Sequence, residues 1–129
     1  MHDSHVYDYS IVRVVPRVDR EEFVNVGVIV SCPARDFLEA HIELDELRVK
    51  ALDPGLDMES IRTHLAAIAV ICSGGPEAGE IGMLPPRRRF EWLTAPRSTV
   101  IQTSPVHTGY CQDPGVVLES LLETMVRIP

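Results

Sequence analysis

The sequence predicts an α+β fold, in which an antiparallel sheet carries two main helices packed on one face. Three observations predict this class. Three strand-like segments come first, at 6–15, 23–32 and 37–44, and only short polar connections separate them. Two amphipathic helical segments come later, and one or two short strands lie between these helices. Strands that follow each other without an intervening helix pair as an antiparallel meander, which disfavours a doubly wound parallel sheet.

The second segment is the clearest strand. Its valines and one cysteine recur with period two, which predicts that they share one buried face. These residues are Val24, Val26, Val28, Val30 and Cys32. The first segment is predicted to pair with it through Val12 and Val14. The third segment alternates apolar and polar side chains, as a half-buried strand does.

The helical segments carry recognisable end signals. Residues 57–73 are expected to form the first main helix, because an aspartate stands at its start and glycines follow it. The final helix opens with Asp113 at the cap and Pro114 at the first helical position. A shorter helix is predicted over residues 45–52.

The remaining segments connect these elements. Residues 74–86 are rich in glycine and proline and are predicted to be a loop. Residues 99–102 and 106–110 are predicted to be short strands bent at Pro105. Because a chain of this size buries roughly two-thirds of its unfolded surface, residues 1–129 are expected to form a single α+β domain.

Composition narrows the class of protein. The net charge of −7 opposes nonspecific nucleic-acid binding over the whole surface. The polar start lacks the regions of a signal peptide, and the longest apolar run, 65–72, is far shorter than the ~20 residues of a membrane span. Three scattered cysteines form no disulfide framework, which favours a cytoplasmic location. No metal or cofactor is predicted, because neither a His/Cys ligand pattern nor a phosphate-binding loop occurs.

Basic side chains gather in one later segment, where four arginines face only Glu91 between residues 82 and 112. They are Arg87, Arg88, Arg89 and Arg97. Two prolines precede the first three, which predicts a stiff exposed loop. Guanidinium groups donate paired hydrogen bonds to phosphates and carboxylates, so an anionic ligand or partner is expected here. Phe90 and Trp92 are expected in the core, and Trp92 is also a candidate anchor for a partner.

The densest polar group of the chain follows. It comprises Arg97, Ser98, Thr99, Gln102, Ser104, His107 and Tyr110. A small hydrolase or nuclease-like enzyme would use Arg97, Gln102 and His107 on an anionic substrate. The group lacks an assigned acid and a nucleophile-elbow pattern, so a catalytic triad is weakly supported. In the simpler interpretation, these residues only begin a strand and its turns.

Two positions in the first strands are also candidate binding residues. Asn25 and Gly27 interrupt one face of the clearest strand. A bulge, with Asn25 bonded to a neighbouring loop, is favoured over a ligand placed against that face. Arg13 shares a strand with apolar residues and is expected to pair with Glu22 rather than to bind a substrate.

Several segments resemble a known bacterial family. The pieces Tyr7-Asp8-Tyr9, Ile11 to Pro16 and Glu22 to Val28 resemble the start of domain of unknown function family 3037. Residues 90–98 and the closing helix are similar as well, so the resemblance covers most of the chain. Members of this family resemble partners of HipA-like serine/threonine kinases, in that the two are often encoded side by side. The resemblance implies no established activity and transfers no catalytic residue.

Three functions follow as hypotheses. The leading one is a non-enzymatic accessory or protein-binding domain, with a HipA-like kinase as the partner that the resemblance implies. The alternatives are the small enzyme described above and a nucleic-acid-binding module that uses Arg87–Arg89. An enzyme should gather the polar groups of residues 97–110 in one concave pocket. A binding domain should show an apolar patch or an unpaired strand edge, and a homo-oligomer is compatible with it.

Overall fold

The computed structural model describes residues 4–129, so most of the polar start considered above lies outside the described residues. A five-stranded antiparallel sheet has the order β3-β2-β1-β4, and β5 also pairs with β1. The strands are β1 (His5–Val14), β2 (Val24–Cys32), β3 (Phe37–Ile42), β4 (Ile101–Thr103) and β5 (His107–Cys111). The predicted α+β class and the antiparallel meander are confirmed.

The helices follow the predicted end signals. They are α1 (Glu46–Leu52), α2 (Met58–Ser73), α3 (Gly79–Gly82), α4 (Pro86–Thr94) and α5 (Pro114–Leu121), which continues into a π-helical turn over Leu122–Val126. Three of them begin at an aspartate whose carboxylate accepts a hydrogen bond from a backbone N–H of the first turn. These caps are Asp45, Asp57 and Asp113.

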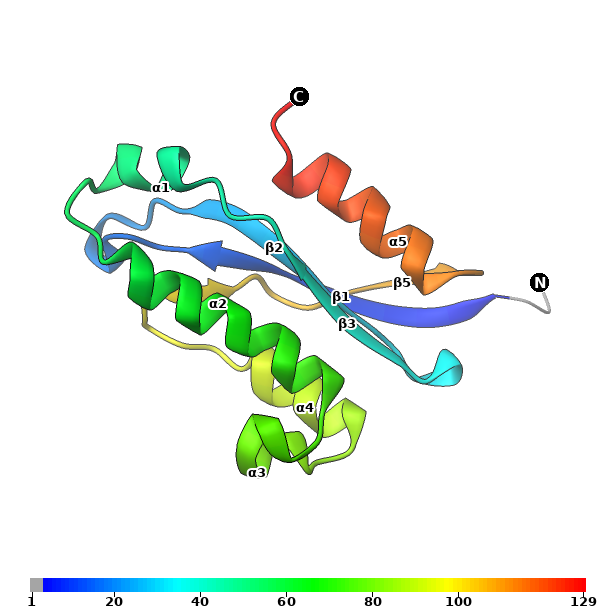
Figure 1. The fold of residues 1–129 in the computed structure, drawn as a ribbon. Coiled ribbons are helices and arrows are strands. Elements are labelled where there is room, and N and C mark those ends of the chain that lie inside the picture. Colours follow the sequence, from blue (N-terminus) through cyan, green and yellow to red (C-terminus); the bar gives the residue numbers. More distant parts are fainter. Residues whose placement is uncertain (1–3) are drawn as a thin grey trace.

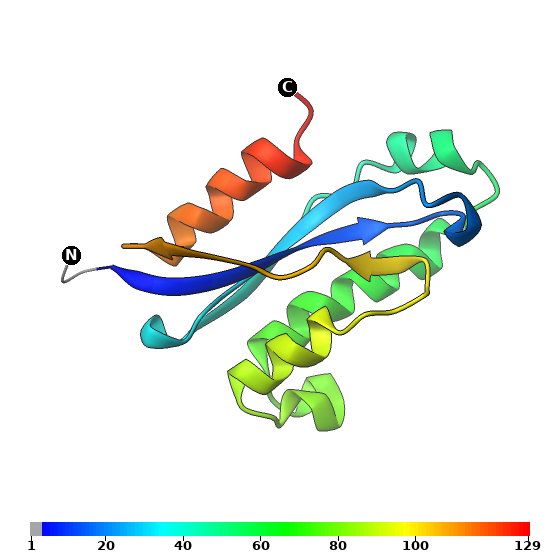
Figure 2. The same ribbon diagram turned by 180° about the vertical axis from the view of Figure 1, so that it is seen from behind.

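The helices cover both faces of the sheet, with α2 and α4 on one side and α5 on the other (Figures 1 and 2). This differs from the expected single covered face. The reason lies in β2, which is apolar on both sides: Ile29 belongs to the core under α2 and α4, whereas Val28 and Val30 belong to the core under α5. A strand with two apolar faces needs a cover on each side.

A β-bulge interrupts the regular pairing of β2 with β1. Val12 stands opposite Gly27 and Arg13 opposite Asn25, so Val26 is an extra residue on β2. The bulge lies beside a tight contact with β3, because a Cβ at Gly27 would stand 2.8 Å from the His41 carbonyl oxygen. The favoured interpretation of this glycine as a bulge signal is confirmed.

The bulge also divides the valines of β2 between the two faces. Val24 and Val26 pack with the core under α2 and α4, and Val28 and Val30 pack with the core under α5. The prediction of one shared face is therefore wrong, because one inserted residue reverses the side to which all later side chains point. The prediction that these residues are buried is confirmed.

The last two strands form one interrupted edge along β1. β4 pairs with the second half of β1 and β5 with the first half, as the predicted bend at Pro105 requires. Ser104 fills the joint between them. Its backbone N–H donates to the Ile11 carbonyl at 2.8 Å, and its hydroxyl accepts from the Ile11 N–H at 2.8 Å.

The arginine-rich segment is helix α4 and not the predicted loop. Pro86 occupies the first helical position, where its missing N–H costs nothing, so the prolines start the helix. Phe90 and Leu93 are three residues apart and both are buried, which turns one side of α4 toward the sheet. The preceding segment, 74–86, also contains a 3-10 turn over Pro76–Ala78 and the short α3.

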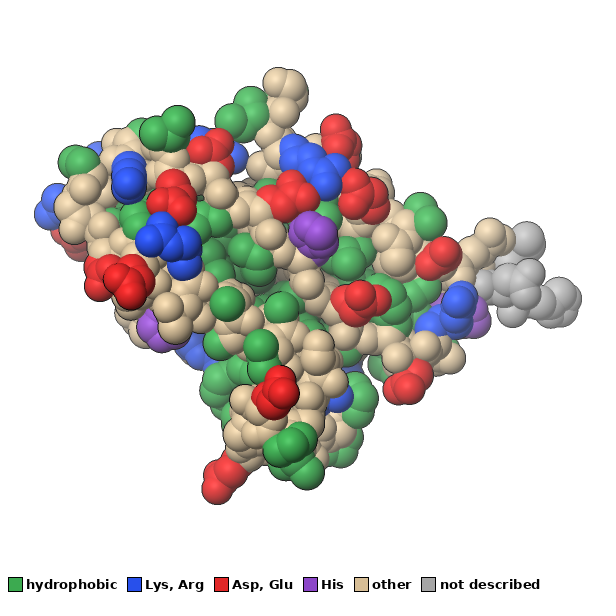
Figure 3. Space-filling view, in the orientation of Figure 1, with side chains coloured by type: hydrophobic (Ala, Val, Ile, Leu, Met, Phe, Trp, Pro, Cys, Tyr) green, Lys and Arg blue, Asp and Glu red, His purple; other side chains and the backbone are tan. Residues whose placement is uncertain are grey.

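Charges of both signs are mixed over the face shown in Figure 3, where basic side chains lie beside acidic ones and form no patch of a single sign. Ion pairs account for part of this pattern, for example Arg62 with Glu46 at 2.7 Å between α2 and α1. Within the part of the chain that the structure describes, no helix has the length and apolar character needed to cross a bilayer.

Candidate binding groove

A groove of about 740 Å³ lies between α2, the end of α4 and β4, and is called the α2–β4 groove below. One side is formed by α2 residues spaced three or four apart, which places them on one side of the helix. They are Ile61, His64, Ile68 and Ile71. Leu93 of α4 and Val100 and Ile101 at β4 add further apolar lining. The polar groups around it include Asp57, Ser60 and Gln102.

Arg97 and Trp92 stand together at this groove. The Arg97 guanidinium lies 4.6 Å from the centre of the Trp92 ring and donates to the carbonyls of Trp92, at 2.6 Å, and Leu93, at 3.0 Å. Arg97 therefore caps the carboxyl end of α4. The expectation that Trp92 lies in the core is wrong, since its side chain is 42% exposed, whereas Phe90 is buried as expected. Phe90 and Leu93 occupy the inner side of α4, which leaves Trp92 at its flank.

Gln102 and Thr99 line the groove on the side of β4 and are held by local hydrogen bonds. The Gln102 side-chain amide donates to the Thr99 carbonyl at 2.8 Å, and the Thr99 hydroxyl donates to the Ile101 carbonyl at 2.8 Å. Ser98 is exposed and does not line the groove. Of the residues singled out from the sequence, the structure thus brings four to one place, namely Trp92, Arg97, Thr99 and Gln102.

Arg89 has a structural place inside the molecule. Its guanidinium donates to the carbonyls of Ile71, at 2.8 Å, and Cys72, at 2.6 Å, which belong to the last turn of α2, and to the Leu84 carbonyl at 3.0 Å. The last carbonyls of a helix lack a donor in the following turn, and of these two only that of Ile71 also accepts from the capping Gly74 N–H, at 3.1 Å. A Cβ on Gly74 would stand 3.0 Å from the guanidinium carbon. Arg89 is buried and offers no exposed charge to a ligand.

Arg87 and Arg88 are exposed but have acidic neighbours. Arg87 pairs with Asp8 of β1 at 2.7 Å and approaches Glu91 at 3.9 Å. Arg88 lies 3.7 Å from the same Glu91. The local excess of positive charge that the sequence indicates is therefore smaller at this surface than the count of arginines suggests.

The polar group of residues 97–110 does not meet in one pocket. Gln102 pairs with Arg13 of β1, whereas His107 pairs with Tyr9, four residues further along the same strand. Four residues of strand correspond to roughly 13 Å. The His107 ring lies 5.2 Å from the Tyr9 ring, and His107 does not line the α2–β4 groove. Ser104 is buried in the joint described above.

Arg13 and Asn25 stand opposite each other across β1 and β2. The expected pair of Arg13 with Glu22 is wrong. The Arg13 guanidinium instead lies 4.1 Å from the centre of the Phe23 ring, and Glu22 pairs with Arg20. The Asn25 amide donates to the Met125 carbonyl at 2.9 Å, so it ties β2 to the end of the C-terminal helix and not to a loop.

The cysteines provide no evident reactive centre. Burial raises the pKa of the Cys72 thiol to about 12, so this thiol stays protonated at neutral pH. Burial also raises the pKa of Cys111. All three cysteines are free thiols. Among residues 4–129, no three His, Cys, Asp or Glu side chains come together in a way that suits a metal ion.

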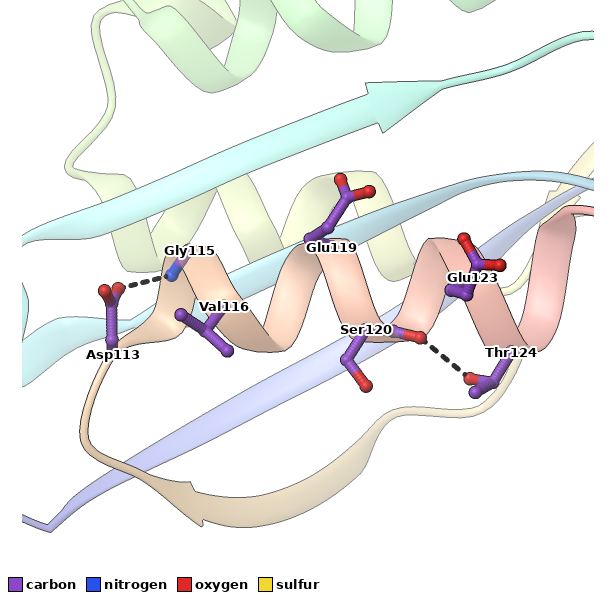
Figure 4. A pocket seen from close by; sticks show the side chains of 7 residues that line it. All are labelled: Asp113, Gly115, Val116, Glu119, Ser120, Glu123 and Thr124. Atoms are coloured by element: carbon purple, nitrogen blue, oxygen red, sulfur yellow. Dashed lines mark hydrogen bonds between the residues drawn. The ribbon is translucent and has the colours of Figure 1, made fainter.

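A second, shallower groove of about 570 Å³ runs along α5, and Figure 4 shows its lining. Most of its polar side chains already have partners in or next to the helix. Asp113 accepts from the Gly115 N–H at 2.9 Å, and the Thr124 hydroxyl donates to the Ser120 carbonyl at 3.0 Å. Glu119 and Glu123 both pair with Arg127. This surface therefore carries no set of free functional groups comparable with the α2–β4 groove.

The chain matches the family described as "Protein of unknown function (DUF3037)" over residues 9–126. This chain belongs to that family. The resemblance seen in the sequence is thereby confirmed over nearly the whole chain. No curated protein and no solved structure matches the chain.

The α2 residues that line the groove are not among the binding residues predicted from the sequence. The spacing of His64 and the isoleucines of α2 fits an exposed and a core side of a helix equally well, so it predicts no groove. The i, i+3, i+7 spacing of Ile61, His64 and Ile68 was the available signal, since it places a histidine within an apolar stripe. Only the neighbouring strand β4 shows that this stripe borders a groove.

Proposed function

We propose that this chain is a non-enzymatic accessory domain that binds a partner protein at the α2–β4 groove. The observation that carries the proposal is the groove lining, where isoleucines of α2 lie opposite β4 beside an exposed tryptophan. Protein interfaces concentrate their binding energy in apolar pockets with tryptophan and arginine nearby. Trp92 is already held in place by Arg97, so it loses little conformational entropy on binding.

The polar rim suits the same role. Asp57, Ser60 and Gln102 surround the apolar lining, which is the common arrangement of protein interfaces. The interpretation as an enzyme has less support, because Gln102 and His107 lie apart on the sheet. A nucleic-acid-binding role also has less support, since Arg89 is buried and Arg87 pairs with Asp8.

The resemblance noted from the sequence makes a HipA-like serine/threonine kinase the first candidate, and a cytoplasmic location would suit both proteins. The expected anionic partner is supported at the α2–β4 groove by one charge only, that of Arg97, whose guanidinium already caps α4.

The test compares two identical substitutions on one helix. Ala67 lines the groove, whereas its neighbour Ala66 does not, and both are exposed on α2. The partner is first captured from the native host with the tagged wild-type chain, identified, and purified. Its affinity is then measured for the wild type, Ala67→Glu, Ala66→Glu and Trp92→Ala.

Ala67→Glu should abolish binding because it places a charge within the apolar lining, and Ala66→Glu should bind as the wild type does. Trp92→Ala should weaken binding about thirty-fold, the effect of losing a binding hot spot of about 2 kcal/mol. Melting temperatures report whether each variant is folded. Equal affinity of folded Ala67→Glu and Ala66→Glu would show that the partner binds elsewhere.

A further inference from the structure

The sheet has two outer edges, and they differ in charge. β3 forms one edge and pairs with β2 alone, while β4 and β5 form the other edge and pair with β1. β3 carries Glu39 and His41 as exposed side chains. Charged side chains along an edge discourage pairing with another strand. In contrast, residues 106–111 contain no Asp, Glu, Lys or Arg.

The hydrogen-bond register leaves the backbone of β5 free on its outer side. The Ser104 N–H donates to the Ile11 carbonyl, and the Val15 N–H donates to the Val100 carbonyl, so odd-numbered β1 residues point toward β4 and β5. Their β5 partners are His107, Gly109 and Cys111. By strand alternation, the N–H and C=O groups of the residues between them point outward. In Figure 2, β5 lies in front of β1, and no helix crosses in front of it.

Exposed apolar side chains flank this free edge on either side of Thr108, whose hydroxyl bonds Asp8 of β1. Tyr110 is 76% exposed, and Val6, its cross-strand neighbour on β1, is 47% exposed. Val106 is 42% exposed and points to the same side of the sheet by alternation. An uncharged edge strand flanked by exposed apolar side chains is the feature that promotes strand pairing between chains.

We propose that two copies of this chain pair through β5 in an antiparallel arrangement with a two-fold axis at Thr108. This register pairs the outward backbone groups of residues 106–110 in both copies through about six hydrogen bonds. It places Val106 opposite Tyr110 of the second copy, so that apolar side chains meet across the axis. Pro105 lies just outside the paired stretch and limits its length, because proline has no N–H to donate.

Charge favours a second copy meeting at this edge over other surfaces. Each chain carries a net charge of −7, so two copies repel each other over most approaches. The β5 edge brings no formal charge into contact with its equivalent. Added salt should therefore strengthen the association, because it screens the general repulsion while the pairing itself contains no ion pair. Five residues of strand form a small interface, so the dimer should be weak and dependent on concentration.

Sedimentation velocity over a range of protein concentrations tests the proposal on the full chain. The wild type should shift from monomer to dimer as concentration rises, and at lower concentration when salt is added. Val106→Lys and Tyr110→Lys should each remain monomeric, because each replaces one side of the apolar Val106–Tyr110 contact across the axis with a charged side chain. Val116→Lys is the matched control; Val116 is 65% exposed on α5, and its variant should dimerise normally.

Two further variants separate strand pairing from simple contact between apolar side chains. Thr108→Pro removes the outward N–H and the hydroxyl that bonds Asp8, whereas Thr108→Val removes only the hydroxyl. Dimerisation should be lost in Thr108→Pro and kept in Thr108→Val. A wild type that stays monomeric at every concentration and salt level would overturn the proposal. So would a dimer that survives in the folded Val106→Lys and Tyr110→Lys variants.

Discussion

The two faces of the sheet hold their helices in different ways. Under α2 and α4, fourteen of the described residues form a buried core, whereas the core under α5 contains five. α5 and the π-helical turn after it have polar anchors in addition. Arg127 pairs with Glu43 beyond β3 at 2.7 Å, and Asn25 donates to the Met125 carbonyl at 2.9 Å.

This difference predicts how strongly substitutions on each face affect the stability of the fold. The larger core is packed by many apolar side chains, and some of them also line the α2–β4 groove at its border. The smaller core contains fewer buried residues, so each of them and each anchor matters more to the position of α5. Four predictions test this comparison.

The largest effect is expected from a charge placed in the smaller core. Val28 is fully buried beneath α5, and Val28→Asp would bury an unpaired carboxylate there. The cost should be several kcal/mol, about enough to unfold the domain. Val6→Asp on the adjacent strand is the control, because Val6 is 47% exposed. Thermal unfolding followed by circular dichroism should show no folded Val28→Asp; an unchanged melting temperature would contradict the assignment of Val28 to this core.

The next effect concerns the polar connection within the larger face. Arg89→Met keeps the bulk of the side chain but removes the donor to the Cys72 and Leu84 carbonyls and one of the two donors to the Ile71 carbonyl. The free energy of unfolding should fall by about 2–4 kcal/mol, since buried acceptors lose their hydrogen bonds. Arg88→Met, one residue away and exposed, should stay within about 0.5 kcal/mol of the wild type. Urea denaturation compares the two, and equal stabilities would refute the structural role of Arg89.

A smaller effect is expected at the bulge that divides β2 between the faces. A Cβ at Gly27 would stand 2.5 Å from the Ile42 Cδ1 atom and close to the backbone of β3. Gly27→Ala should destabilise the fold by about 1–3 kcal/mol, because the backbone of β3 must move to admit it. At Gly55, the nearest such atom lies 3.5 Å away, so Gly55→Ala serves as the neutral control. Stability of Gly27→Ala equal to that of the control would show that this bulge is loosely packed.

The smallest effect is a pH dependence at the anchor of α5. The hydrogen bond from Arg127 lowers the pKa of Glu43 below its ordinary value in the folded protein. Its stabilisation is therefore complete above the ordinary carboxyl pKa and is lost as the pH falls through the lowered, folded-state value. The melting temperature of the wild type should exceed that of Glu43→Gln at neutral pH, and the difference should shrink in acid.

This difference should be small because the pair is partly solvated, and it should decrease at high salt. The Ala66→Glu variant, far from this ion pair in sequence and on the opposite face of the sheet, controls for general effects of acid on the fold. A difference between wild type and Glu43→Gln that is constant with pH would show that Glu43 acts by packing alone.

Local signals in the sequence determined which segments form the strands and the helices α1, α2 and α5, whereas α3 and α4 lie in segments predicted as loops. Alternating side chains marked β3, aspartates marked the starts of α1, α2 and α5, and Pro105 marked the break between β4 and β5. These signals act over a few residues, so they can be read without knowing what lies nearby. The family resemblance is likewise a local signal, because it depends on short segments such as Tyr7-Asp8-Tyr9.

Tertiary structure alone decided the faces and the partners of side chains. One extra residue at Val26 reversed the side to which Val28 points; Asn25 and Gly27 indicate a bulge, but only the pairing with β1 decides which residue is inserted. Arg89 lies inside because it donates to two carbonyls at the end of α2, which are 17 and 18 positions earlier in the chain. The burial of a side chain, its hydrogen-bond partners and the position of a groove depend on contacts between segments that are distant in the sequence. Those contacts are determined by the packing of the whole chain and not by any short segment.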